Sequence, residues 1–587
     1  MMKKYNFLLM IVIAGICSCN DLLELQNDGR ITVDEIFTTR NGVRGYLNSC
    51  YNYRFTFSYD RSSLCDDAHD SDGTFANSLF SYWYGNAYTA SSFNATDGNT
   101  RWSDYFEGIR KCNVFINNMV NMAPNTILAT EGELTGWVAQ ARTLRALYYL
   151  QLIKRYGGVP LITEPYATTH DYSADRRASF SEVVAQILQD CDDALAAPDI
   201  ENGFSWDVLT NRGGIMTRAV AYAIKSEAIT YACSPLWADG AYSWADATRI
   251  NAEALYQCIT HGYVLFTDTP AENVAQNTYA LYFITRPDEL RAYDKETIYN
   301  GTVVNVWQNA GMPSTPGQAK AGSCPTQELV DSYEMANGEP PILGYSDRQH
   351  LTPIINTASG YDANNPYVNR DPRFYATIYY NGAHRTLGAS PSLVETFAGA
   401  VDGITTTDRR TTHTGYYLRK YNNWASNRDN DADGSTRLFR VAVLYLNFAE
   451  SAYQSHGPDV AIDMGGGTSM SAREAVGEVR NRAGMPPFPS GMTSADFERK
   501  YRNERRVELA FEEHRYFDVR RWRILEETER YVTGMRITQE GGNLNYTRIG
   551  FERGSWLDKY YLYPVPQNEV NKMQDHTGVN WQNNGWN

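Results

Sequence analysis

One stretch of the sequence combines aromatic and polar side chains in the way that sugar recognition requires. It reads CDDAHDSDGTFANSLFSYWYGNAY and spans residues 65–88. Sugars present flat C–H faces that stack on aromatic rings, and hydroxyl rims that bond to Asp, Asn and Arg side chains. The stretch therefore predicts a ligand-binding loop, unless Trp83 only packs the loop onto the rest of the protein. Its candidate binding residues are Asp67, Tyr82, Trp83, Tyr84 and Asn86.

A second stretch with the same chemistry lies much later in the chain. It reads IYNGTVVNVWQN and spans residues 298–309. Its aromatic rings and amides again suit a sugar face and rim. The alternative is that Trp307 packs this segment onto the fold. The candidate binding residues here are Tyr299, Asn305, Trp307 and Gln308.

The most charged helical stretch, 502–522, invites a catalytic or metal-binding interpretation because it carries His514 among several acids. It contains neither HExxH nor ExxH, so the spacing of a zinc site is absent. On a helix, His514 falls on the same face as apolar residues, which predicts a packed, hydrogen-bonded histidine. Glu512 and Arg515 are spaced for a pair on the helix surface. We therefore predict a structural helix here.

No other motif supports enzymatic chemistry. DNDADG (429–434) resembles an EF-hand loop, but position 12 is Arg440 where a bidentate Glu is needed, so we predict a solvated acidic turn, with adventitious calcium as the alternative. GGG (465–467) lacks the Lys-Ser/Thr of a phosphate loop and is expected to be a linker. No pair among the 68 acidic residues is singled out for glycoside hydrolysis. The motifs thus identify no catalytic residues, no metal site and no cofactor, and we predict none.

The N-terminus has the pattern of an export signal. Two lysines precede an apolar run of 11 residues that ends at Cys17 and is too short to span a bilayer. The segment ICSC (16–19) resembles a bacterial lipoprotein box, so residues 1–18 are predicted to be the signal peptide and Cys19 the lipidated residue. The alternative is an ordinary signal peptide followed by a free cysteine. No later stretch approaches 18 consecutive apolar residues, so lipid would be the only membrane attachment.

The composition is that of a globular protein, with 43% hydrophobic and 21% charged residues among 587. The 53 basic and 68 acidic residues give a net charge of −15, which argues against nucleic acid as a partner. Tyrosine is abundant, at 42 residues. This is typical of surfaces that hold polar ligands, although large extracellular bacterial proteins are also simply rich in tyrosine.

Seven cysteines follow Cys19, an odd number, at scattered positions without any CxxC. Neither a zinc site nor a disulfide framework is indicated, and we expect most of them to be buried small apolar residues. A bridge between Cys50 and Cys65 is permitted in an exported chain but not established.

Helical periodicity dominates the chain. In 134–152 the apolar residues fall at spacings of three and four on one face, and Gly157-Gly158 and Pro160 end that helix. Similar periodicity recurs in 102–122, 178–197, 214–234, 245–260, 438–456, 470–484 and 495–525. Pairs of antiparallel helices are the economical arrangement, and their spacing is loosely that of tetratricopeptide-like units. We expect an all-α scaffold that carries two irregular insertions, at 57–101 and 262–437.

Several segments resemble the SusD/RagB family of surface lipoproteins in Bacteroidetes. They occur in family order and cover most of the chain. The segments are SCNDLLEL (18–25), ARTLRALYYLQLIKRYGGVPLI (141–162), PTQELVDSYEMANGEPP (325–341), NRDPRFYATIYYNG (369–382), VAVLYLNFAESAY (441–453), VRNRAGMP (479–486), RNERRVELAFEEHRYFDVRRW (502–522) and YLYPVPQNEVN (561–571).

The resemblance implies an α-helical fold on four tetratricopeptide-like helix pairs, and a non-enzymatic lipoprotein of the outer membrane at the cell surface. It implies a SusC-like TonB-dependent transporter as partner, on which the protein sits as a lid and to which it delivers an oligosaccharide or polysaccharide ligand. It also places family ligand contacts in the regions of both aromatic stretches. A peptide-binding member of the family and a transporter-bound scaffold without its own ligand are the alternatives. The expected divisions are 1–18 (signal peptide), 19–40 (anchored tether), 41–261 (helical region with the ligand loop 57–101), 262–437 (insertion) and 438–587 (C-terminal helical region and tail).

Overall fold

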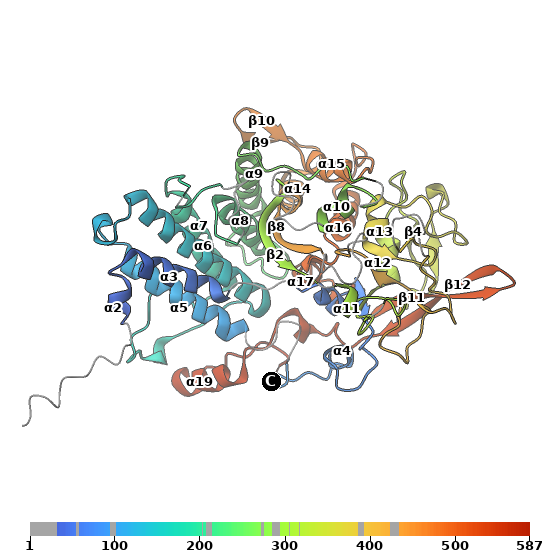
Figure 1. Cartoon of the computed structure of the whole chain (residues 1–587), viewed down its shortest axis with the longest axis horizontal. Coiled ribbons are helices and arrows are strands. Elements are labelled where there is room, and N and C mark those ends of the chain that lie inside the picture. Colours follow the sequence, from blue (N-terminus) through green and yellow to red (C-terminus); the bar gives the residue numbers. More distant parts are fainter. Residues whose placement is uncertain are drawn as a thin grey trace, which may run out of the picture.

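The structure is a computed structural model of the chain (Figure 1). Several of the sequence-based expectations lie outside the residues that it describes, namely the signal peptide, Cys19, Asn305 and the acidic turn up to residue 433. The described residues are 32–586, apart from 54–57, 94–100, 202, 207–213, 272–274, 285–293, 305, 316, 386–392 and 423–433.

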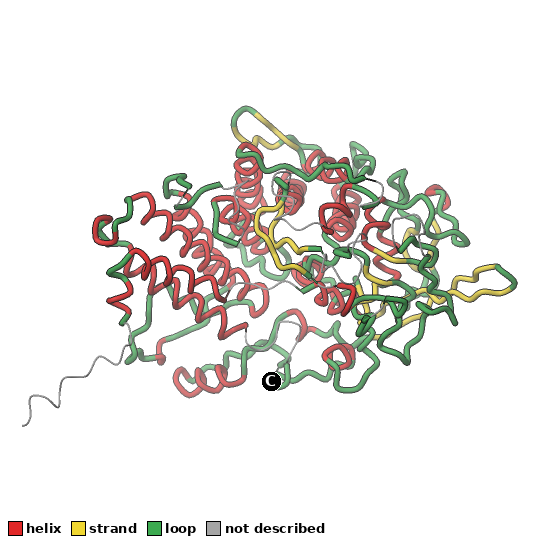
Figure 2. Tube along the Cα trace, in the orientation of Figure 1, coloured by secondary structure: helices red, strands yellow, loops and turns green. Residues whose placement is uncertain are grey.

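The long helices before residue 261 form one side of the molecule, on the left of Figures 1 and 2. Each packs against the next in the chain from α5 to α9, and α9 then packs against α14. This is the helix-pair scaffold that the periodicity predicts, and the all-α class is confirmed. The long helices are α3 (Arg40–Cys50), α5 (Arg101–Met119), α6 (Glu131–Tyr156), α7 (Phe180–Leu195), α8 (Arg218–Ala232), α9 (Trp244–Thr260), α14 (Val441–His456), α15 (Ala472–Arg482) and α16 (Ser494–Glu508).

Local sequence signals set the ends of these helices. At the start of α6 the Thr130 side chain accepts a hydrogen bond from the Glu133 backbone N–H, and the Glu133 carboxylate accepts one from the Thr130 N–H. This reciprocal cap satisfies two backbone donors that the helix leaves free. The same helix ends at Gly157, whose φ of 75° is costly for other residues. Both ends of α6 can therefore be read from the sequence.

The other side of the molecule is irregular, with short helices and two-stranded antiparallel ladders among loops (Figure 2). The ladders pair β1 (Ala68–Asp70) with β3 (Ser323–Pro325), β2 (Thr297–Val303) with β8 (Ser435–Arg440), β4 (Ile342–Tyr345) with β5 (Pro353–Ile355), β6 (Ile378–Tyr379) with β7 (Tyr417–Leu418), β9 (Ile462–Gly465) with β10 (Thr468–Met470), and β11 (Tyr531–Glu540) with β12 (Asn543–Glu552). The remaining helices are α2 (Val33–Ile36), α4 (Leu79–Tyr84), α10 (Thr278–Ile284), α11 (Val306–Asn309), α12 (Gln327–Ser332), α13 (Pro372–Thr377), α17 (His514–Arg521), α18 (Leu525–Glu529) and α19 (Gln567–Thr577). Of these, α2 and α19 lie on the left of Figure 1, with the long helices.

The glycines at 465–467 do not form the expected linker. They make the turn between β9 and β10, and all three have positive φ. Glycine is the residue that adopts such angles without strain, so a tight hairpin takes the place of a flexible connection.

The charged segment 502–522 is interrupted and buried. α16 ends at Glu508 and α17 begins at His514, and the turn between them includes Phe511 and Glu513 with φ of 60° and 64°. The expected single helix is therefore wrong at this point. His514 is buried, as its place among apolar residues predicts.

The predicted surface pair of Glu512 and Arg515 is also wrong. Glu512 is buried and binds the Lys420 ammonium at 2.7 Å, whereas Arg515 binds Asp66 at 2.7 Å. The helical spacing that would place the two side chains together is lost because the chain turns between α16 and α17.

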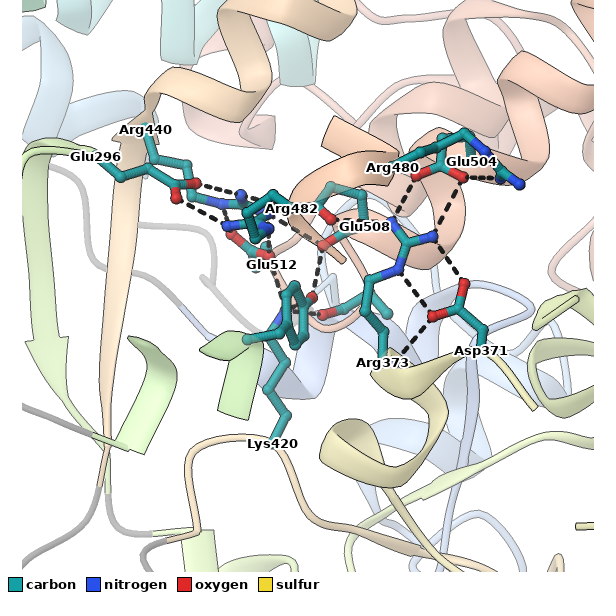
Figure 3. A network of polar contacts seen from close by, with 12 residues as sticks. Glu296, Asp371, Arg373, Lys420, Arg440, Arg480, Arg482, Glu504, Glu508 and Glu512 are labelled. Carbon is teal, nitrogen blue, oxygen red and sulfur yellow. Dashed lines mark hydrogen bonds and ion pairs between the residues drawn. The ribbon is translucent and has the colours of Figure 1, made fainter. Parts of the chain in front are cut away.

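Ten charged residues around this turn, all with buried side chains, form a continuous network, here called the ionic core (Figure 3). Glu508 stands at its centre, with Arg373 at 3.0 Å and Arg440 at 2.7 Å and with Arg482 also in contact. Because these residues come from both the helical and the irregular side, the network joins the two. The members are Glu296, Asp371, Arg373, Lys420, Arg440, Arg480, Arg482, Glu504, Glu508 and Glu512.

All seven cysteines after Cys19 are buried and unbridged, so the bridge between Cys50 and Cys65 does not form. Their burial agrees with the expected role as small apolar residues. Within the described part of the chain, no helix combines the length and the apolar character that crossing a membrane demands.

Candidate functional site

A short ladder brings the two aromatic stretches into one region. β1 belongs to the first stretch, and it pairs with β3, which follows the second; Asp70 lies opposite Ser323. Beyond the ladder, the Ser71 N–H donates to the Gly322 carbonyl at 2.9 Å. Segments that are far apart in the sequence are therefore held side by side by backbone hydrogen bonds.

Lys320 connects the two stretches through its side chain and its backbone. Its ammonium lies 3.3 Å from Asp72 and 5.5 Å from the centre of the Phe80 ring, both in the first stretch. Its neighbour Ala319 donates a backbone hydrogen bond to the Gln308 carbonyl at 2.8 Å. Asp72 also accepts from Arg409 at 2.8 Å, so a third loop joins the same region.

Three of the predicted binding residues lie at the surface of this region. Tyr82 on α4 is 37% exposed, and its hydroxyl donates to Asn77 at 3.2 Å. On α11, Trp307 is half-buried and Gln308 is exposed. We call the exposed parts of these three residues, together with Lys320 and Arg409, the loop surface.

The remaining predicted residues of the first stretch are turned inward. Asp67 is buried and binds Arg506 at 2.8 Å. The Trp83 ring is buried with its centre 4.6 Å from that of Tyr560. As placed, neither side chain offers a face to a ligand, and Trp83 anchors the loop, as the packing alternative anticipates.

Tyr84, Asn86 and Tyr299 also have structural contacts. The Tyr84 hydroxyl donates to the Ser63 carbonyl at 2.8 Å and accepts from the Asp70 N–H at 2.9 Å. Asn86 is half-buried with a φ of 53°, and it ends the turn after α4. Tyr299 is buried in β2.

Asp70 lies directly behind the loop surface and is fully buried. Burial raises its pKa to about 7; nearby Lys320 opposes this shift, while Asp60 adds to it. Its Oδ1 accepts a hydrogen bond from the Asp72 N–H at 2.9 Å. The floor of the site thus contains a carboxyl group that is largely protonated below about pH 7.

The side chains of the loop surface are aromatic, amide and cationic. Among the described residues, no group of three or more His, Cys, Asp or Glu side chains could hold a metal ion. Aromatic rings beside amide and cationic donors suit the binding of a polar ligand.

Sequence reasoning did not identify Lys320 and Arg409. Both lie in the irregular region 262–437 without a motif around them. Their position is set by the β1–β3 ladder and by the bond from the Ala321 N–H to the Arg409 carbonyl, which are long-range contacts. Lys320 and Arg409 could have been identified only by assuming that the two aromatic stretches lie together in the fold.

The inward role of Tyr84 can be tested by Tyr84→Phe. The change leaves the buried Asp70 N–H and Ser63 carbonyl without their partner, so the free energy of unfolding is expected to fall by about 1–3 kcal/mol. Urea unfolding measures this loss. Binding of any ligand at the loop surface should remain unchanged under native conditions, and weaker ligand binding at full stability would contradict the assignment.

Comparisons with known proteins agree with this fold. The sequence matches the model of the SusD family over residues 288–586, and a model described as "Starch-binding associating with outer membrane" over residues 21–202. No curated protein sequence matches the chain.

Solved structures resemble it along nearly its whole length. A SusD-like protein from Bacteroides fragilis has a TM-score of 0.74 at 24% identity, covering 94% of this chain and 98% of its own. A SusD-like carbohydrate binding protein from the same species has a TM-score of 0.66 at 20% identity, and the match covers 92% of this chain and 99% of that protein. Surface glycan-binding protein A from Bacteroides fluxus has a TM-score of 0.56 at 19% identity, and the match covers 93% of this chain and 100% of that protein. These likenesses establish the fold, and because the first family match extends over half of the sequence, the chain belongs to the SusD family.

Proposed function

We propose that the protein is a lipid-anchored glycan-binding protein of the outer membrane that captures oligosaccharides at the cell surface and delivers them to a SusC-like TonB-dependent transporter. The proposal rests on one observation: the β1–β3 ladder and Lys320 hold the two aromatic stretches together. Tyr82, Trp307 and Gln308 then lie at the surface. The carbohydrate and glycan ligands in the names of similar structures support the ligand class.

Each group on the loop surface has a task in this proposal. The rings of Tyr82 and Trp307 stack on sugar faces. The Gln308 amide and the cations of Lys320 and Arg409 donate hydrogen bonds to sugar oxygens. Arg409 keeps 54% of its side chain exposed while it binds Asp72, so donors remain for a ligand. No bond of the sugar is broken in this scheme, so the protein needs no catalytic residue.

The anchor and the transporter are proposed from the sequence and the family. Cys19 in its lipoprotein box would tie the protein to the outer membrane, and the description of the second family model points to the same membrane. A single lipid-modified cysteine followed by a tether holds a folded domain while leaving it free to swing over a transporter. Co-purification with a TonB-dependent transporter from native outer membranes is the test of this part.

The glycan assignment is tested by native affinity electrophoresis of the protein from residue 20 onward, in gels with plant, host and microbial polysaccharides. We expect one polysaccharide class to retard it. Trp307→Ala and Tyr82→Ala should each weaken the retardation at least tenfold, equivalent to about 1.4 kcal/mol of binding free energy. The matched control is Trp244→Ala, which removes a half-buried tryptophan from the start of α9 in the helical scaffold.

Three outcomes would replace the proposal. Retardation that survives both loop variants would place the glycan elsewhere on the molecule. Binding of peptides without any glycan would make the protein a peptide-binding family member. Binding of the transporter without any soluble ligand would make it a scaffold.

A further inference from the structure

A pocket lies away from the loop surface, on the helical side of the molecule. It is lined by α5, the segment 160–175, α19 and Trp581, and its volume is about 320 Å³. In Figure 1, α5 and α19 lie on the left, whereas α4 and α11 of the loop surface lie on the right. Pockets of this size accommodate small molecules rather than chain segments.

Aromatic side chains form much of the pocket wall. Trp102 and Phe106 on α5 face it, with their ring centres 5.0 Å apart, and Trp581 and Tyr166 line it from other elements. Trp102 and Trp581 are almost fully buried by the surrounding protein, so the ring faces open to a ligand are those of the half-buried Phe106 and Tyr166. Flat apolar faces at fixed angles are the surfaces on which sugar rings stack.

Hydrogen bonds hold the wall in place without any ligand. The buried Asn113 amide donates to the Ile162 carbonyl at 2.9 Å and accepts from Arg145 at 2.8 Å. The Tyr149 hydroxyl donates to the same carbonyl at 2.9 Å and accepts from the Ile162 N–H at 2.7 Å. The segment at residues 160–164 is thereby fixed to α5 and α6, so the pocket is preformed and ordering it costs a ligand little free energy.

The opposite wall is also built in advance. The Tyr166 ring stacks on His170 at 3.6 Å, and both donate toward Asp175, the tyrosine hydroxyl at 3.2 Å and the histidine Nε2 at 3.0 Å. The Lys572 ammonium of α19 lies 4.2 Å from the centre of the Tyr172 ring, and both residues line the pocket.

The charges of the pocket restrict the chemistry of its ligand. Four carboxylates and two cations line it, so its net charge is negative. Carboxylates accept hydrogen bonds from hydroxyls and amines, and they repel anions. The charged lining residues are Glu107, Arg110, Glu164, Asp175, Glu569 and Lys572.

We propose that this pocket is a second saccharide site, which takes one or two sugar residues that are neutral or carry an amine and excludes uronic acids. The inference rests on the proposed glycan-binding function. With one site on the loops and one on the helical scaffold, the protein holds a glycan at two separate points, which increases its effective affinity for long chains beyond that of either site.

The experiment is calorimetric titration with maltose, cellobiose, lactose, the disaccharide of glucosamine, and digalacturonate. Ser103→Trp fills the pocket from its exposed rim without removing a packed side chain, and Phe106→Ala removes a stacking face. We expect at least one neutral or amine-bearing disaccharide to bind at two sites per chain. Ser103→Trp and Phe106→Ala should each weaken one of them at least tenfold, and Trp307→Ala should weaken only the other.

The outcomes separate the two proposals. A single site that Trp307→Ala abolishes and Ser103→Trp leaves intact overturns the second site and leaves the proposed function standing. Strong binding of digalacturonate at the Ser103-sensitive site overturns the assigned ligand class. Binding that is lost in Ser103→Trp but retained in Trp307→Ala supports the pocket and overturns the loop surface. No binding of any of these disaccharides by the wild-type protein overturns the second site, and the electrophoresis with polysaccharides decides the proposed function independently.

Discussion

Replacing Arg440 by Met lowers the free energy of unfolding by about 3–5 kcal/mol, because it leaves buried carboxylates without the cation that they share. Arg440 lies 2.8 Å from Glu296 and 2.7 Å from both Glu508 and Glu512, and all four side chains are buried (Figure 3). Methionine fills much of the same volume, so the loss reports on charge rather than on a cavity.

The measurement is equilibrium urea unfolding followed by circular dichroism. The matched control is Arg176→Met, which breaks an exposed pair with Glu182 whose charged atoms are 2.6 Å apart. An exposed pair contributes less than about 1 kcal/mol, since water screens it. Equal losses for the two variants would show that the ionic core does not stabilise the fold.

Acid titration examines the same network. Burial alone would raise the pKa of Glu508, but Arg482, Arg440 and Arg373 together hold it at about 2. Because the pKa of this carboxyl is lower in the folded than in the unfolded state, its stabilisation is complete above about pH 4.5 and is lost as the pH falls toward 2. In Arg440→Met the acid unfolding transition should begin at higher pH. An unchanged transition would contradict this role of Arg440.

The helices could be predicted from the sequence because their signals are local. Apolar spacing, the cap of Thr130 with Glu133 and the stop at Gly157 all act within a few residues. The break between α16 and α17 depends instead on long-range partners of Glu508 and Glu512, among them Arg440 of β8 and Lys420. No local pattern shows that a charged helix will be drawn into the interior.

The candidate site could be predicted only in part for a related reason. The composition of the first stretch indicates aromatic ligand chemistry, but three adjacent rings, Tyr82, Trp83 and Tyr84, compete for the same surface. Which ring points outward is decided by distant partners, such as Tyr560 under Trp83. The cations of the loop surface depend on the β1–β3 ladder, which joins segments too far apart for spacing rules.

Asp70→Asn makes the protein more stable than the wild type at alkaline pH, and the difference disappears toward acid pH. In the folded protein burial raises the pKa of Asp70 to about 7. The unfolded chain releases the same proton at about pH 4. The wild type therefore loses stability from this group as the pH rises from about 4 to about 7, whereas asparagine does not titrate and loses none.

Between pH 5 and pH 8 we expect the stability difference between Asp70→Asn and wild type to widen by about 3 kcal/mol, since one pKa unit corresponds to about 1.4 kcal/mol. Urea unfolding at a series of pH values measures this change. The control is Asp362→Asn, because hydrogen bonds from Asn364 and Asn365 lower the pKa of the exposed Asp362 carboxyl and keep it ionised throughout that range. A difference that stays constant with pH would show that Asp70 is already ionised at pH 5.

The same titration bears on ligand binding, because Asp70 is in contact with the groups that hold the two loops together. Its Oδ1 lies 3.6 Å from the Lys320 ammonium, which bridges to Asp72 at 3.3 Å. Ionised Asp70 competes for this ammonium, whereas protonated Asp70 leaves it to Asp72 and the surface. We therefore expect glycan retardation of the wild type to weaken above about pH 7 and that of Asp70→Asn to stay constant. If the stability of the wild type changes with pH but its retardation by the glycan does not, the ionisation of Asp70 has no effect on glycan binding.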